Sequence, residues 1–209
     1  IMTDLMNNPT FEQYYISRYI DLGNTVFSCD FMIGHLDSLI NLIAPEMPGQ
    51  VARWGSSVAT WEANVQTLRD FITDRCVEIE TGLVDCYDLV GPYGVTYEVE
   101  PIGAGTIEVN SITLDQYPWT GTYYGGIDIL LQANANASYI FDYWESSISD
   151  PLNPAADSVD ASILITGNQT ITAHFRTEGT PPTPTFEGVY VPTGFSPNND
   201  GNNDYLQTY

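Results

Sequence analysis

The stretch GPYGVTYEVEP, residues 91–101, is where the hydrophobic pattern of the chain changes to a period of two. Val95, Tyr97 and Val99 alternate with polar side chains, which is typical of a β-strand with one buried face. Further short alternating runs follow, separated by Gly, Asn and Pro, so the sequence predicts a compact β-domain after this point. The expected strands are GVTYEVEP, GTIEVNSITL, IDILLQANA, SYIFDYWES, DASILITG and QTITAHFR.

Acidic side chains on the first two of these strands follow the same alternation. Glu98, Glu100 and Glu108 stand between apolar residues. Two carboxylates are what a glycosidase uses, but the alternation favours a solvated strand face for all three.

The segment before the strands, residues 1 to about 80, has apolar residues at three-to-four spacing, which predicts helices. Pro45 ends the second run, and serines after Gly55 are placed to cap the third. Three helices that must each bury a stripe make either a small bundle or a cap on a missing partner. The stripes are Phe11, Tyr15, Tyr19, Leu22 and Val26; Ile33, Leu36, Ile40 and Ile43; and Trp61, Val65, Leu68, Ile72, Cys76 and Ile79.

The composition excludes several classes of function. The 209 residues carry a formal charge of −22 and contain five Arg and no Lys. Binding to nucleic acid or to an anionic membrane surface requires clustered cations, so neither is expected. No apolar run reaches the roughly 18 residues of a membrane-spanning helix, so we expect no transmembrane segment.

The C-terminal part of the chain has a different composition. TEGTPPTPT, residues 177–185, predicts an extended linker, because it is too poor in apolar residues to fold. Both chain ends read as cut from something larger, which suggests an internal fragment. The sequence therefore predicts an α+β multidomain fragment: a helical bundle (1–86), a small antiparallel β-module (87–176), the linker (177–185), and the start of a β-sandwich-like domain (186–209).

Three cysteines are too few for a disulfide framework. Cys76 and Cys86 are close in sequence, between a helix end and the next segment, and we expect them to form a disulfide. Such a bridge would imply an oxidising, extracytoplasmic location. Cys29 lies in an apolar helix and is expected to be a small buried residue.

Three segments resemble known families. FEQYYISRYIDLGNTVFSCDFMIGHLDSL, PEMPGQVARWG and the following stretches to residue 112 resemble the C-terminal part of secreted CotH-family, spore-coat kinase-like proteins. YGGIDILLQANANASYIFDYWE and the later TITAHF resemble the internalin-type B repeat, a small β-grasp-like module. VYVPTGFSPNNDGNNDYL resembles the opening of the gliding-motility-associated C-terminal domain, the sorting signal of type IX secretion cargo.

The CotH resemblance implies ATP-dependent phosphoryl transfer, which needs cations on the phosphates and a metal held by carboxylates or Asn. The chain has no lysine and no glycine-rich loop that opens a helix, so we expect no kinase activity from it. Arg53 is expected to fix a turn beside Trp54 rather than to face a substrate. His35 and His174 have no second histidine or free cysteine at ligand spacing, which argues against a transition-metal site.

The loop GFSPNNDGNND, residues 194–204, has oxygen-bearing side chains at alternate positions and a glycine for a sharp turn, as calcium loops do. The ligands would be Ser196, Asn198, Asp200 and Asp204. Only two of these carry charge, so the pattern fits either a weak calcium site or a plain Asx/Gly turn. No other cofactor is required.

Two further candidate sites lie in the β-module. The aromatic cluster Tyr117, Trp119, Tyr123 and Tyr124 is either a platform that binds sugars or proteins by stacking, or a hairpin that covers the core. Asp157-Ser158-Val159 resembles an Asp-Ser/Thr-aliphatic O-glycosylation site of bacteria with such secreted cargo, and the alternative is a solvated loop.

The resemblances together predict a non-catalytic part of a secreted, cell-surface CotH-like protein exported across the outer membrane. Its partners would be the type IX translocon and shuttle components. One alternative is structural support of an active ATP-dependent kinase in the full-length parent. Another is an adhesin module that binds cell-surface glycans or proteins.

Overall fold

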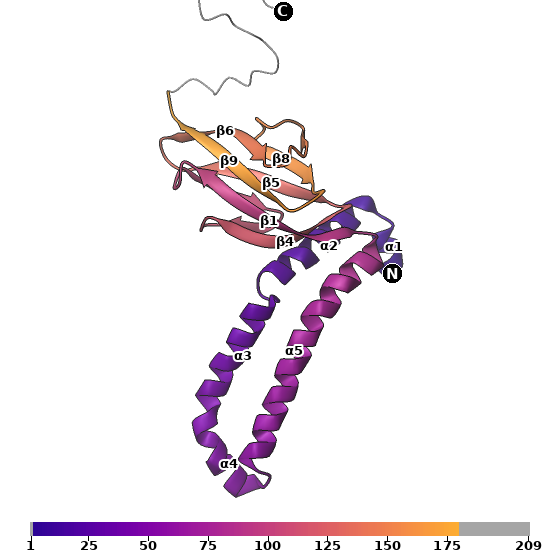
Figure 1. The fold of residues 1–209 in the computed structure, drawn as a ribbon, viewed down its shortest axis with the longest axis vertical. Coiled ribbons are helices and arrows are strands. Elements are labelled where there is room, and N and C mark those ends of the chain that lie inside the picture. Colours follow the sequence, from indigo (N-terminus) through magenta and orange to yellow (C-terminus); the bar gives the residue numbers. More distant parts are fainter. Residues whose placement is uncertain (1, 180–209) are drawn as a thin grey trace, which may run out of the picture. The chain divides into compact units, whose positions relative to one another are not determined.

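The computed structural model describes residues 2–179, in which the helices come first and the strands follow (Figure 1). The α+β class predicted from the sequence is confirmed. Ile1–Glu178 belongs to one compact unit, so helices and strands are parts of the same unit. The sorting-domain segment, 186–209, and most of the predicted linker lie outside the described residues. The helical elements are α1 (Met2–Met6), α2 (Pro9–Asn24), α3 (Cys29–Ile43), η1 (Ala44–Glu46), α4 (Met47–Trp54) and α5 (Val58–Tyr87).

Polar side chains fix where the three long helices begin. Asn8 caps α2, Ser28 caps α3 and Ser57 caps α5, and each side-chain oxygen accepts a hydrogen bond from a backbone amide of the first turn. α5 continues to Tyr87, beyond the predicted stripe, and Asp88 ends it with a left-handed backbone (φ 52°).

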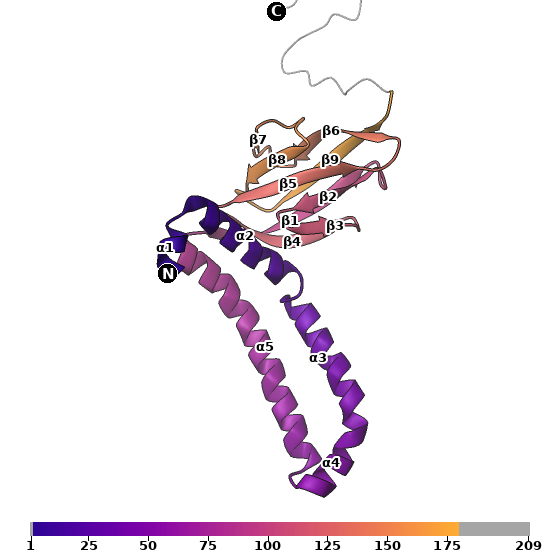
Figure 2. The ribbon, with the colours of Figure 1, turned by 180° about the vertical axis from the view of Figure 1, so that it is seen from behind.

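The helices do not form the predicted three-helix bundle. α3 and α5 lie side by side as a pair, joined through η1 and α4, whereas α2 packs against the strands (Figure 1, Figure 2). Leu36 and Ile72 are buried in the pair. The helices therefore bury their stripes against two different partners. Several large apolar side chains of α3 and α5 are exposed: Phe31, Leu39, Leu42, Phe71 and Val77.

The strands form two sheets. Sheet A has the order β4-β1-β9-β6, and sheet B has the order β3-β2-β5-β8-β7. Every pairing is antiparallel, as the sequence predicts, except that of β1 with β9, which is parallel. The strands are β1 (Val90–Glu100), β2 (Gly105–Val109), β3 (Ile112–Leu114), β4 (Trp119–Gly125), β5 (Asp128–Ala135), β6 (Tyr139–Ser146), β7 (Leu152–Asn153), β8 (Asp160–Leu164) and β9 (Gln169–Thr177).

One core lies between the two sheets. Val95, Tyr97 and Val99 of β1 are buried, as their alternation predicts, and they share the core with Ile107 and Leu131 of sheet B. Alternate side chains on each strand point away from the core, so each sheet also has an outer face.

No single helix in residues 2–179 is long and apolar enough to cross a membrane. Two consecutive helical stretches, Pro9–Asn24 and Cys29–Trp54, reach the required length and composition only when taken together, and they are bent by 52° at the break between them.

Candidate functional site

The face that α2 turns toward the β-module is apolar at its centre. Ile16 and Ile20 are buried one helical turn apart, and both belong to the same core as the two sheets. The predicted stripe lies beside this face: Tyr15 and Tyr19 are half-buried, and Val26 is exposed. Helix and sheets therefore share one hydrophobic core.

A carboxylate lies inside this helix–sheet junction. Asp21 is fully buried and follows directly after Ile20. It accepts hydrogen bonds from the Asn110 side chain (3.1 Å), from the Ser111 backbone amide (2.9 Å) and from the Ser111 hydroxyl. The Arg18 guanidinium donates to the same Ser111 hydroxyl (2.7 Å). The turn between β2 and β3 is thus joined to α2 by one network, which we call the Asp21 network.

Burial dominates the electrostatics of this network. Removal from water raises the pKa of the Asp21 carboxyl above its usual value of 3.8, and the hydrogen bonds from Ser111 and Asn110 and the charge of Arg18 offset part of that rise. A buried carboxylate is costly unless it is hydrogen-bonded, so the network permits Asp21 to stand in the core.

Two amide side chains of α2 complete the junction. Asn24 donates to the Thr122 carbonyl (2.8 Å) and accepts from the Thr122 amide (2.7 Å), as a neighbouring strand would do along the edge of β4. Gln13 donates to the Asp128 carbonyl at the start of β5 (2.7 Å). Each contact satisfies backbone groups of the β-module, so α2 is held at a defined position along the sheets.

The sequence offered one signal for this junction that the pattern of stripes missed. An aspartate next to Ile20 on the apolar side of a helix needs hydrogen-bonding partners. Its partners, Asn110 and Ser111, are about 90 residues away and form an unremarkable polar turn, so the sequence alone does not identify them.

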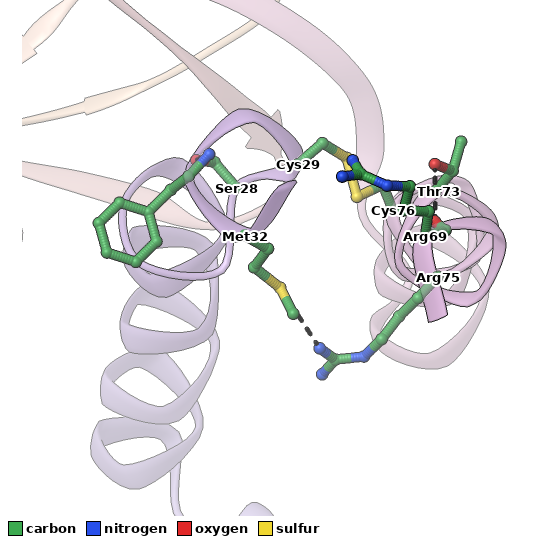
Figure 3. The surroundings of a disulfide bond; sticks show 8 residues. Ser28, Cys29, Met32, Arg69, Thr73, Arg75 and Cys76 are labelled. Atoms are coloured by element: carbon green, nitrogen blue, oxygen red, sulfur yellow. Dashed lines mark hydrogen bonds between the residues drawn. A yellow bond between two sulfur atoms is a disulfide. The ribbon is translucent and has the colours of Figure 1, made fainter. Parts of the chain in front are cut away.

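A disulfide joins α3 to α5, and its partners differ from the predicted ones. Cys29 at the start of α3 is bonded to Cys76 of α5, with a Cα–Cα distance of 6.1 Å (Figure 3). The predicted Cys76–Cys86 bridge is wrong because both residues lie on one continuous helix. Ten helical residues rise about 15 Å, whereas disulfides need about 4.4–6.8 Å between Cα atoms. Cys86 is an exposed free thiol.

Side chains around the disulfide also connect the two helices. The Arg75 guanidinium of α5 points toward Met32 of α3 (Figure 3) and lies 5.7 Å from the centre of the Phe27 ring. Further along the pair, Arg69 forms an ion pair with Asp37. Cations of α5 therefore contact α3 and the loop before it.

The aromatic cluster does not form a binding platform. Tyr123 and Tyr124 are buried, so their assignment to a binding surface is wrong. Tyr117 is half-buried, and its hydroxyl accepts from the Ile107 amide and donates to the Leu114 carbonyl, both at 2.6 Å. Trp119, Tyr123 and Tyr97 pack ring to ring. The cluster covers and fills the core, the alternative that the sequence left open.

Ser158 lies half-buried in the loop between β7 and β8. Its hydroxyl donates to the Asp160 carbonyl (2.6 Å), and its own carbonyl accepts from the Trp144 indole (2.9 Å). O-glycosylation at Ser158 stays a prediction.

The remaining chemical candidates make structural contacts. Arg53 lies 5.3 Å from the centre of the Trp54 ring, and His35 stacks on Phe31. His174 lies between Glu145 (2.9 Å) and Glu100 (3.5 Å) on the outer face of sheet A. Among the described residues, no three His, Cys, Asp or Glu side chains gather in a way that could hold a metal ion. The predicted calcium ligands Ser196, Asn198, Asp200 and Asp204 lie outside the described residues.

Two family models match separate parts of the chain. The CotH kinase protein model matches residues 1–79, and the divergent InlB B-repeat domain model matches residues 95–179. No curated protein and no solved structure matches the chain. The two similarities point to part of a secreted or cell-surface protein. The resemblance of 186–209 to a sorting domain has no such match and stays a prediction.

Proposed function

We propose that this chain is a non-catalytic connecting part of a secreted, cell-surface CotH-like protein. In this account the helices belong to the CotH-like region, and the β-module is a spacer held rigidly against them. The observation that carries the proposal is the Asp21 network, which joins a helix in the CotH-like segment to a turn in the B-repeat-like segment. A flexible linker between independent domains would need no such buried contact.

The arginines support a non-catalytic role. Phosphoryl transfer needs cations that are directed at phosphate groups, but each arginine of this chain contacts another side chain of the fold. Arg18 donates to Ser111, Arg53 lies over Trp54, Arg69 pairs with Asp37, Arg75 lies over Phe27, and Arg176 pairs with Asp142.

Titration of residues 1–209 with ATP and Mg²⁺ by calorimetry tests this role. We expect no heat of binding. Magnesium-dependent ATP binding would contradict the proposal and would favour the alternative, in which these helices support an active protein kinase in the full-length parent. The match to a CotH kinase protein model is the observation that favours this alternative.

We propose the export route of the protein from the sequence of its C-terminal segment. Residues 186–209 are the start of a type IX sorting domain, which the translocon and shuttle components of that system would recognise. Deleting the segment that begins at Phe186 from the full-length protein should leave it inside the cell envelope. Unchanged appearance of the protein at the cell surface would contradict this proposal.

Calcium binding at Asp200 and Asp204 is proposed as a weak accessory property of the same tail. Calorimetric titration of the complete tail domain with CaCl₂ should give a dissociation constant near the millimolar range of extracellular calcium modules. If calcium gives neither heat nor stabilisation, the calcium site is contradicted and residues 194–204 are a plain Asx/Gly turn.

A further inference from the structure

The outer face of sheet B contains a polar hollow of about 370 Å³. It lies where β2, β5, β8 and β7 are adjacent, on the side of the sheet away from the core. We call it the sheet-B hollow and define it by six lining side chains: Glu108, Leu130, Gln132, Asn153, Asp160 and Ser162. Its volume falls in the range of small-molecule sites, about 300–1,000 Å³.

Strand register arranges these side chains in two rows. Glu108 of β2 is opposite Gln132 of β5, and Gln132 is opposite Asp160 of β8, so the three form one polar row. The Gln132 amide donates to the Asp160 carboxylate (2.7 Å), which fixes the centre of the row.

The second row contains an apolar side chain. Leu130 of β5 is opposite Ser162 of β8, which is opposite Asn153 of β7. Leu130 is 49% exposed although it is in the middle strand of the sheet. The hollow therefore presents an apolar patch beside a line of hydrogen-bonding groups.

Several of these polar groups have no partner within residues 2–179. The side chains of Glu108, Ser162 and Asn153 make no hydrogen bond or ion pair there. Neighbouring strands are about 4.8 Å apart, so successive groups in a row are spaced to meet hydroxyls along a sugar ring. The carbon–hydrogen face of such a ring can pack on Leu130.

The negative charge of the hollow disfavours anionic ligands. Glu108 and Asp160 are both acidic, and no Lys or Arg lines the hollow, so an anionic ligand would be repelled. A single bound cation does not fit either. Glu108 and Asp160 are only two carboxylates, whereas calcium takes about six to eight oxygen ligands, and within residues 2–179 no three His, Cys, Asp or Glu side chains gather in a way that could hold a metal ion.

Strand addition by a peptide is also excluded at this place. Glu108 and Gln132 are paired with residues on both neighbouring strands, and Ser162 is paired with Leu130 and Asn153, so the centre of the hollow offers no free backbone edge to a peptide. Recognition must use side chains. We propose that the sheet-B hollow binds a neutral oligosaccharide, an activity that goes beyond the proposed connecting role and does not depend on it.

The test uses the whole chain, residues 1–209, on an array of immobilised oligosaccharides. The neutral probes are hexamers of β-1,4-linked glucose, xylose, mannose and N-acetylglucosamine, and the anionic probes are polygalacturonate and heparin. We expect binding to at least one neutral probe, to neither anionic probe, and with no loss of binding in EDTA. Calorimetry in solution then gives the dissociation constant.

Variants test whether the ligand binds at the sheet-B hollow. Glu108→Ala and Gln132→Ala should each weaken binding about tenfold, the effect of losing one strong hydrogen bond. Glu98→Ala is the matched control, because Glu98 is an exposed glutamate on the outer face of sheet A, and it should bind like the unmodified chain. Three results would each overturn the proposal: no neutral probe is bound, binding requires a divalent cation, or Glu98→Ala weakens binding as much as the two hollow variants do.

Discussion

Asp21 is a single residue on which the contact between helix and strands depends. Replacing it with alanine removes the acceptor that the half-buried Asn110 side chain and the exposed Ser111 share, at a position that is itself fully buried. We expect Asp21→Ala to lower the free energy of unfolding by about 1–3 kcal/mol, measured by urea denaturation. Glu98→Ala, which removes an exposed carboxylate, should leave the midpoint unchanged. Equal midpoints for all three proteins would mean that the Asp21 network adds no stability.

The same residue should make stability depend on pH. Burial raises the pKa of the Asp21 carboxyl in the folded state, so the folded protein binds more protons than the unfolded chain near and above pH 3.8. The contribution of this carboxyl to stability is therefore complete at low pH and is lost as the pH rises through the folded pKa.

Asp21→Asn, which has no carboxyl to titrate, isolates this contribution. The difference in unfolding free energy between the unmodified chain and Asp21→Asn should move against the unmodified chain as the pH rises from 3 to 7. A difference that is constant over this range, measured by urea denaturation at each pH, would contradict the raised pKa.

Single residues also show the limits of what the sequence predicts. The alternation of Val95, Tyr97 and Val99 gave the correct buried face, because β-strand geometry acts between neighbours in the chain. For Tyr123 and Tyr124 the sequence left open a binding platform or a hairpin that covers the core, because their segment, rich in Gly and Pro, was not recognised as strand β4. A helix in another part of the chain covers the edge of that strand.

At the scale of elements, the pairing of cysteines can be tested directly. Digestion of the non-reduced protein should release one linked pair of peptides, containing Cys29 and Cys76, and Cys86 should be alkylated before reduction. Mass spectrometry of the peptides gives the answer. A linked peptide that contains Cys86 would contradict the arrangement of α3 and α5.

The disulfide should also stabilise the helical pair. It closes a loop of 47 residues, for which the loop-entropy estimate is about 4 kcal/mol. Cys29→Ser should therefore lower the free energy of unfolding, with the larger effect on amide protection in α3 and the facing half of α5. Cys86→Ser is the matched control and should change neither quantity. Equal protection in both variants would show that the bridge contributes no stability.

The elements were predicted more accurately than their partners. Apolar spacing located the three long helices, and a serine cap marked the start of the third, because both signals are local. The packing of α2 on the sheets and the one parallel pairing, β1 with β9, were not predicted, because both join residues far apart in sequence. No local pattern distinguishes a helix that packs on another helix from one that packs on a sheet.

For the whole molecule, the two family matches and the fold divide the chain differently. The matches end at residue 79 and begin again at residue 95, yet α5 continues through the first boundary, and α2 contributes to the core of the second region. If the connecting role is correct, the helices and the β-module should lose structure together when the chain unfolds.

Hydrogen exchange measured by mass spectrometry on residues 1–209, over a series of low urea concentrations, tests this coupling most directly. We expect peptides from α2 and from β2, β3 and β4 to open in one cooperative event. Asp21→Ala should lower the opening free energy of all of them by the same amount. The opposite result is that α2 exchanges while the strands stay protected and that Asp21→Ala affects α2 alone. It would show that the helix and the β-module unfold independently, and it would contradict the proposed connecting role.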